Sequence, residues 1–139
     1  TNVPLPLDGN VFISVNDYDK GAVVKIAREL HMLGFKIVAT EGTAAFLGMV
    51  GIPSTRINKV SQGSPHVVDA MRSGDIHLVI NTPRGEEAHQ DGVIIRGAAV
   101  ALGIPIITTL SAATASVQGI KAVRTKPLKV RSLQTHHRA

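Results

Sequence analysis

Five short apolar runs alternate along this chain with segments that have the length and apolar spacing of helices. The runs are rich in β-branched and aromatic residues and lie at positions 11–15, 35–39, 54–57, 76–80 and 104–107. The helical segments lie at positions 20–33, 43–50, 66–72, 86–102 and 111–122, and Asp91-Gly92 is a candidate break in the fourth of these. Consecutive strand–helix–strand units place their strands parallel. The sequence therefore predicts an α/β fold with a five-stranded parallel sheet between two layers of helices.

Polar residues follow every one of the five predicted strands. They are Asn16, Asp17 and Lys20 after the first strand, Thr40 and Thr43 after the second, Asn58 and Lys59 after the third, Asn81 and Thr82 after the fourth, and Thr108 and Thr109 after the fifth. In an open parallel sheet, ligands bind outside the carboxyl ends of the strands. Hydroxyl, amide and ammonium groups without a dominant carboxylate suit a phosphorylated ligand. We therefore expect an anion site at this edge of the sheet.

The central wall of that site is predicted at residues 37–45, where an apolar strand runs through Thr40, Gly42 and Thr43 into a helix. A helix start offers free backbone N–H groups and the positive end of the helix dipole. The alternative for this stretch is purely structural, with Thr43 as an N-cap and Gly42 as a turn residue.

Composition narrows the class of protein. The chain has 139 residues, enough for one domain with a proper core, and it contains no cysteine. Disulfides and thiolate chemistry are therefore excluded, which favours an intracellular, cytoplasmic protein. No apolar run reaches the length that crosses a bilayer. The net charge is +5, and no acidic residue follows Asp91, so the basic excess lies largely in the C-terminal part.

The two ends of the chain differ in character from the middle. Residues 1–9 are punctuated by prolines and are predicted to be a linker from an upstream domain, so the chain is expected to be a fragment of a longer one. Residues 10–122 are predicted to form the domain itself. Residues 123–139 form a basic tail, predicted to be extended from Lys126-Pro127 onward.

Several segments in order resemble the methylglyoxal-synthase-like domain family. They are residues 9–15, Asp19-Lys20, Ala-Thr-Glu-Gly-Thr-Ala at 39–44, Asn-Lys-Val-Ser-Gln-Gly-Ser-Pro-His at 58–66, and Val-Ile-Asn-Thr at 79–82. Within the family the loop 58–66 and the strand end 79–82 are most similar to the allosteric domain that ends the large subunit of carbamoyl phosphate synthases. The tail at 130–134 resembles the end of many bacterial large subunits. The resemblance implies a three-layer fold with strand order 3-2-1-4-5.

The resemblance also implies a regulatory domain that binds a nucleoside monophosphate, UMP or IMP, and so modulates carbamoyl phosphate synthesis for the pyrimidine and arginine pathways. Matched by position, the phosphate would be bound by Lys20, Thr40, Gly42 and Thr43, with Lys59, Asn81 and Thr82 near the phosphate or ribose. No catalytic residue, metal or cofactor is expected in this domain. ATP, Mg or Mn, and K would belong to other domains of the large subunit, which would pair with a small glutaminase subunit in an oligomer. Pro83 departs from the family pattern, in which a threonine lines the site.

Two other functions compete with this one. The same phosphate cradle would serve methylglyoxal synthase, a lyase acting on dihydroxyacetone phosphate, but that enzyme uses an aspartate in a Gly-Gly-Asp loop and the stretch 63–66 carries none. Asp17, Asp69 and His89 are the remaining candidates for proton transfer.

Nucleic-acid binding by the basic tail is disfavoured because the tail has no interleaved aromatic residues. A metal site at His136-His137 is disfavoured because no carboxylate lies nearby.

Overall fold

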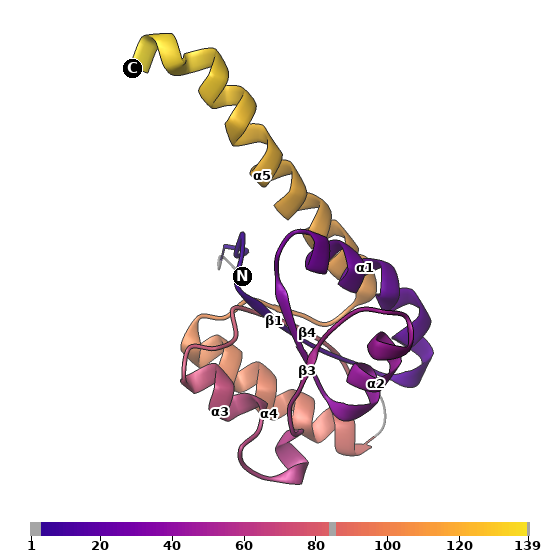
Figure 1. Ribbon diagram of the computed structural model, residues 1–139. Coiled ribbons are helices and arrows are strands. Elements are labelled where there is room, and N and C mark those ends of the chain that lie inside the picture. Colours follow the sequence, from indigo (N-terminus) through magenta and orange to yellow (C-terminus); the bar gives the residue numbers. More distant parts are fainter. Residues whose placement is uncertain (1–3, 84–85, 139) are drawn as a thin grey trace.

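One sheet of five parallel strands organises the structure (Figure 1). The computed structural model describes the backbone of residues 4–83 and 86–138 and the side chains of residues 4–83 and 89–125. The strands are β1 (Asn10–Val15), β2 (Lys36–Ala39), β3 (Thr55–Arg56), β4 (Leu78–Thr82) and β5 (Ile106–Ile107). Their order across the sheet is β3-β2-β1-β4-β5, so the predicted order 3-2-1-4-5 is confirmed.

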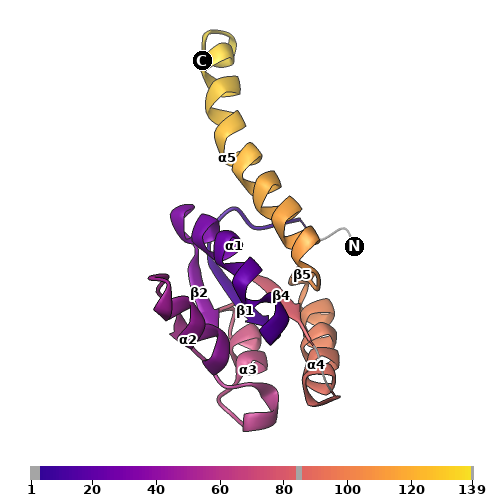
Figure 2. The ribbon, with the colours of Figure 1, turned by 90° about the vertical axis from the view of Figure 1, so that its right-hand side faces the viewer.

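The helices lie on both faces of the sheet (Figure 2). They are α1 (Lys20–Met32), α2 (Glu41–Met49), α3 (Val67–Arg72), α4 (Glu86–Leu102) and α5 (Leu110–Arg138), with two 3-10 turns, η1 (Asp17–Asp19) and η2 (Val60–Gln62). One core cluster joins α1, α2 and α5 to one face of the sheet, and a second joins α3 and α4 to the other. This three-layer α/β/α arrangement confirms the predicted fold class.

Strand β1 lies at the centre of the sheet, and its side chains pack into both core clusters. Val11, Ile13 and Val15 point into the cluster with α1, and Phe12 points into the cluster with α3 and α4, because successive side chains of a strand alternate between faces. Strand β4 beside it is buried at every position, as expected for a parallel strand covered by helices on both sides.

Three of the differences from the predicted elements lie beside the ends of β1, β2 and β4, and each has a local cause. Strand β4 continues to Thr82, since Ser14 pairs with Asn81 and Val15 with Thr82 in the β1 ladder. Helix α2 begins at Glu41 with Thr40 as its N-cap residue, two residues before the predicted start. Helix α4 runs unbroken through Gly92, which packs against the end of β4.

The prediction of an extended tail is wrong. Helix α5 continues through Pro127 to Arg138 and projects from the domain (Figures 1 and 2). Lysine, arginine, leucine and glutamine, which have high helix propensity, predominate around Pro127, while the proline itself removes one backbone donor from the helix. Near its start α5 packs on α1, where Lys121 Nζ lies 3.5 Å from Glu29 Oε2. No helix in the described part of the chain has the length and apolar character that crossing a membrane requires.

Candidate functional site

A cavity of about 360 Å³ opens at the carboxyl ends of β1, β2 and β4. All seven residues that sequence reasoning assigned to effector binding line it, namely Lys20, Thr40, Gly42, Thr43, Lys59, Asn81 and Thr82. Further polar lining comes from Ser14, Asn16, Asp17, Tyr18 and Asp91, and apolar lining from Phe12, Val15, Pro83 and Ile95. The chain proceeds from β1 outward to β2 and β3, then returns to β4 on the other side, so the cavity lies where the strand order reverses.

The N-terminus of α2 forms one wall of the cavity. Thr40 is its N-cap residue, but within the described residues the Thr40 side chain makes no capping hydrogen bond. Its hydroxyl instead donates to Ser14 Oγ at the end of β1, across 3.2 Å. The first N–H groups of a helix have no partner inside the helix. The first turn of α2 therefore presents backbone donors and a positive dipole end to the cavity.

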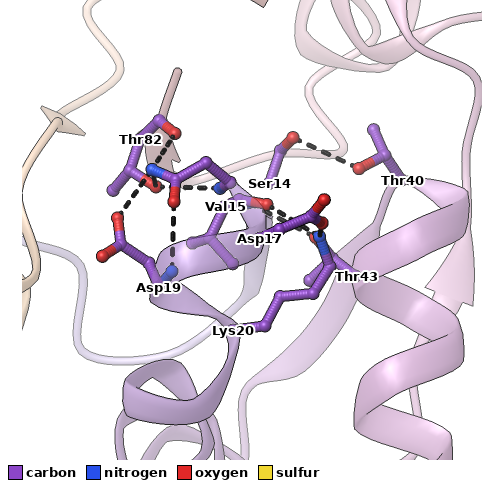
Figure 3. A network of polar contacts seen from close by, with 9 residues as sticks. Ser14, Val15, Asp17, Asp19, Lys20, Thr40, Thr43 and Thr82 are labelled. Atoms are coloured by element: carbon purple, nitrogen blue, oxygen red, sulfur yellow. Dashed lines mark hydrogen bonds and ion pairs between the residues drawn. The ribbon is translucent and has the colours of Figure 1, made fainter. Parts of the chain in front are cut away.

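Thr43 lies inside the first turn of α2 and is almost fully buried. Its Oγ1 accepts a hydrogen bond from the Val15 backbone N–H at 3.3 Å, which joins α2 to the end of β1 (Figure 3). The alternative that made Thr43 the N-cap is therefore wrong, since Thr40 holds that position. With an Oγ1 lone pair taken by Val15, the Thr43 hydroxyl proton is available to an acceptor in the cavity.

Asn16 links the end of β1 to the end of β4 through hydrogen bonds. Its side-chain amide donates to the Thr82 carbonyl oxygen at 3.0 Å and to an Asp19 carboxylate oxygen at 2.8 Å. Its side-chain oxygen accepts from the Asp19 backbone N–H at 3.0 Å, and its backbone N–H donates to Thr82 Oγ1 at 3.2 Å. Asn16 thus fixes both η1 and the Thr82 hydroxyl. The sequence indicated only that a polar residue ends the strand here.

Lys20 brings a positive charge to the α2 N-terminus. Its ammonium donates to Asp17 Oδ1 at 2.6 Å and to the Val15 carbonyl oxygen at 3.3 Å (Figure 3). Gly42 has no side chain, and a Cβ at that position would lie 3.7 Å from Lys20 Nζ, so the ammonium lies directly beside the first turn of α2. The hydrogen bond from Lys20, then its charge and more weakly that of Lys59, hold the pKa of Asp17 below its usual range.

Helix α4 closes the opposite side of the cavity. A Cβ at Gly92 would lie 3.3 Å from the Asn81 amide nitrogen and from Pro83 Cγ, so the glycine permits the close approach of α4 to β4. The residue directly before it is Asp91, whose Oδ2 accepts from the Ser61 hydroxyl at 3.1 Å and from the Ser61 backbone N–H at 3.3 Å. This contact anchors η2, and with it Lys59, to α4. Sequence reasoning missed it because the two residues are 30 positions apart.

Three predicted strand-end residues lie outside the cavity, namely Asn58, Thr108 and Thr109. Thr109 Oγ1 accepts from the Ala112 backbone N–H at 3.1 Å and so caps α5, and Asn58 donates to the Gly63 carbonyl oxygen at 3.2 Å. The expectation that all five strand ends converge is therefore wrong for β5, an edge strand. A loop is predicted from the sequence at 81–85, and its residues 84 and 85 lie outside the described residues.

Of the three candidates for proton transfer, Asp17 lines the cavity and is paired with Lys20, whereas Asp69 and His89 are not among the lining residues. Asp69 accepts from the His66 backbone N–H at 2.8 Å at the start of α3, and this bond is the main cause that lowers the pKa of Asp69. His89 lies exposed on α4. Among residues whose side chains the structure describes, no three histidine or carboxylate groups gather as a metal site would require. His136 and His137 are outside that set.

Comparisons with known proteins extend over almost the whole chain. The family model described as MGS-like domain matches residues 22–108. The carbamoyl phosphate synthase large chain, C-terminal section, of Methanocaldococcus jannaschii is 51% identical over 133 residues, which are 95% of this chain and 22% of that protein. The corresponding section from Methanopyrus kandleri is 48% identical, over 96% of this chain and 25% of that protein.

A full carbamoyl phosphate synthase large chain, from Acidobacterium capsulatum, is 48% identical over 96% of this chain and 12% of its own length. The chain thus spans a quarter or less of these relatives. The crystal structure of methylglyoxal synthase from Elizabethkingia anophelis NUHP1 has the same fold, with a TM-score of 0.65, 17% identity, and coverage of 81% of this chain and 79% of that one. Because the family model covers more than half of its residues, this chain belongs to the MGS-like domain family.

Proposed function

We propose that this chain is the regulatory domain of a carbamoyl phosphate synthase large subunit and binds a nucleoside monophosphate, UMP or IMP, by its phosphate. The observation that carries the proposal is the convergence of Lys20, Thr43 and the N-terminus of α2 on one cavity. Relatives that are 48–51% identical and are named as parts of carbamoyl phosphate synthase large chains supply the context.

The donors around the α2 N-terminus suit a phosphate dianion. The first-turn N–H groups and the Thr43 hydroxyl are neutral donors, and the Lys20 ammonium adds a positive charge beside Gly42. Hydrogen bonds in which one partner is charged are about twice as strong as neutral ones. Thr40 contributes through its contact with Ser14, whose hydroxyl faces the same cavity.

The rest of the cavity has room for a nucleoside. Its volume of about 360 Å³ falls within the usual range for small-molecule sites. Asn81, Thr82 and Lys59 offer polar groups for a ribose, and Pro83 and Ile95 offer apolar surface for a base. Pro83 at the rim has neither a hydroxyl nor an N–H donor, so the contacts of the effector at this point differ from those of a threonine-bearing site.

Methylglyoxal synthase remains the second candidate because of the shared fold and phosphate cradle. Among the side chains that the structure describes, two carboxylates line the cavity: Asp17, paired with Lys20, and Asp91, hydrogen-bonded to Ser61. Neither lies in a loop of the Gly-Gly-Asp type, and a base that abstracts a proton must reach its substrate unencumbered. The regulatory function is therefore preferred.

Regulation of a distant site requires that the effector bind two states of the whole enzyme with different affinities, typically by about 1–3 kcal/mol. In this proposal residues 1–9 connect the domain to the rest of the large subunit, residues 10–122 bind the effector, and residues 123–139 form a basic appendage. The other domains would use ATP with Mg or Mn and K, a small glutaminase subunit would supply ammonia, and the oligomeric enzyme would work in the cytoplasm.

Isothermal titration calorimetry of the 139-residue chain with UMP, IMP and dihydroxyacetone phosphate tests the proposal. Because hydrogen bonds to charged groups contribute about 1.5–3 kcal/mol, Lys20→Gln is expected to weaken nucleotide binding roughly 10- to 150-fold. Lys25→Gln, on the exposed side of the same helix, is the matched control and should bind as the wild type does. Absence of nucleotide binding, or equal binding by Lys20→Gln, would refute the proposal. Formation of methylglyoxal from dihydroxyacetone phosphate would establish the alternative.

A further inference from the structure

The ion pair between Asp17 and Lys20 lies at the mouth of the cavity. Asp17 belongs to η1 and its side chain is 95% exposed, whereas the Lys20 side chain is only 17% exposed. Lys20 Nζ lies 2.6 Å from Asp17 Oδ1. The lysine is therefore held by the protein next to α2, and the carboxylate reaches in to it from solvent.

Lys20 has few donors left for a ligand. An ammonium group has three N–H donors. One is directed to Asp17 and one to the Val15 carbonyl oxygen, so one remains. A phosphate that accepts from it lies across the same ammonium from the Asp17 carboxylate, within roughly 5–6 Å when both make charge-assisted bonds. Two anions at that separation repel each other.

We propose that Asp17 limits the affinity of the site, because its carboxylate repels the phosphate of the effector at Lys20. When that phosphate binds, the Asp17 carboxylate moves away from the Lys20 ammonium into solvent. This inference rests on the proposed function and adds the regulation of the same site. The exposure of Asp17 makes the movement inexpensive, because its carboxylate is already largely hydrated. The charge of Lys59 also lowers the pKa of Asp17, and Lys59 lines the same cavity. The bound phosphate would therefore interact with Lys59 as well.

The opposite role for Asp17 is to position Lys20 for the ligand, and the two roles predict changes of opposite sign. If Asp17 limits affinity, Asp17→Asn binds phosphate ligands more tightly than the wild type. If Asp17 positions the lysine, the same variant binds them more weakly. The side chain belongs to neither core cluster, so the substitution leaves the fold intact.

Calorimetric titration with UMP and with inorganic phosphate distinguishes these roles. Because exposed ion pairs are weak, Asp17→Asn and Asp17→Ser are expected to bind UMP about two- to fivefold more tightly. Asp19→Asn is the matched control, since it removes the same charge two residues away while its amide oxygen still accepts from Asn16. It should bind within about 1.5-fold of the wild type, because solvent and salt screen a charge that makes no direct contact with the site.

A second readout follows the carboxylate itself. Carbon-13 NMR of the Asp17 carboxyl group should show its pKa rising when phosphate is added to the wild type, since the ligand takes its cationic partners. Equal or weaker UMP binding by Asp17→Asn, or an equal gain in Asp19→Asn, would overturn this inference while leaving the proposed function in place. If the wild type binds none of UMP, IMP and inorganic phosphate, both this inference and the proposed function are overturned.

Discussion

Replacing Thr43 by valine removes one hydroxyl that serves both the fold and the proposed site. The side chain is 1% exposed and its Oγ1 accepts from the Val15 N–H at the end of β1. Valine has nearly the same shape, so the core keeps its packing while the acceptor disappears. A buried donor that loses its partner costs about 1–3 kcal/mol. The separation of 3.3 Å is long for this bond and favours the lower part of that range.

We therefore expect Thr43→Val to lower the free energy of unfolding by about 1–2 kcal/mol, which corresponds to a decrease in Tm of roughly 3–8 °C for a chain of this length. Urea denaturation followed by circular dichroism measures the first quantity, and a thermal scan the second. In addition, loss of a donor to a charged phosphate should weaken UMP binding roughly 10- to 150-fold in a calorimetric titration.

Thr43→Ser separates the two effects. It keeps the hydroxyl and loses one methyl group, at a cost of about 0.8 kcal/mol of burial. Its free energy of unfolding should therefore fall by about 0.8 kcal/mol, somewhat less than for Thr43→Val, whereas its UMP affinity should stay within about threefold of the wild type. Unchanged unfolding of Thr43→Val would show that the bond to Val15 contributes nothing. Unchanged UMP binding would show that Thr43 is not part of the site.

Two further substitutions probe the surroundings of the cavity. The folded-state pKa of Asp69 is lowered, so its stabilisation is present above the ordinary value of 3.8 and is lost as the pH falls through the folded pKa. Urea denaturation should therefore show the free energies of unfolding of the wild type and Asp69→Ala converging as the pH falls below 3.8. A pH-independent difference would contradict this. Gly92→Val should lower stability by about 1–3 kcal/mol and weaken UMP binding by displacing α4 from Asn81 and Pro83. Gly97→Val is its control, because a Cβ there meets nothing within 4 Å, and equal effects of both would show that contact with β4 is irrelevant.

Local sequence patterns accounted for the elements and for most of the cavity lining. Thr40, Thr43 and Asn81 could be found because each stands at the end of an apolar run, and a parallel sheet brings such ends to one edge. Lys20 could be found because the first helix begins directly after the first strand end. These inferences need only the periodicity of the chain and the geometry of a parallel sheet. Their roles in binding remain predictions.

Contacts between distant segments could not be found in this way. The bond from Ser61 to Asp91 depends on how closely η2 approaches α4, and that approach depends on Gly92 packing against β4. Asp17 and Lys20 are only three positions apart, yet whether they pair or remain solvated depends on η1, which Asn16 fixes through the end of β4.

The sequence by itself determined that this chain forms a parallel α/β sheet with polar groups at the strand ends, because periodicity and turn chemistry are local properties. The tertiary structure decided which of those groups meet. Thr109 follows the edge strand β5, so it lies away from the cavity and caps α5. Thr82 extends β4 and pairs with Val15 of the central strand β1. The tertiary structure also placed the Asp17 carboxylate against Lys20, the lysine proposed to bind phosphate, because charge pairing depends on distances in space rather than along the chain.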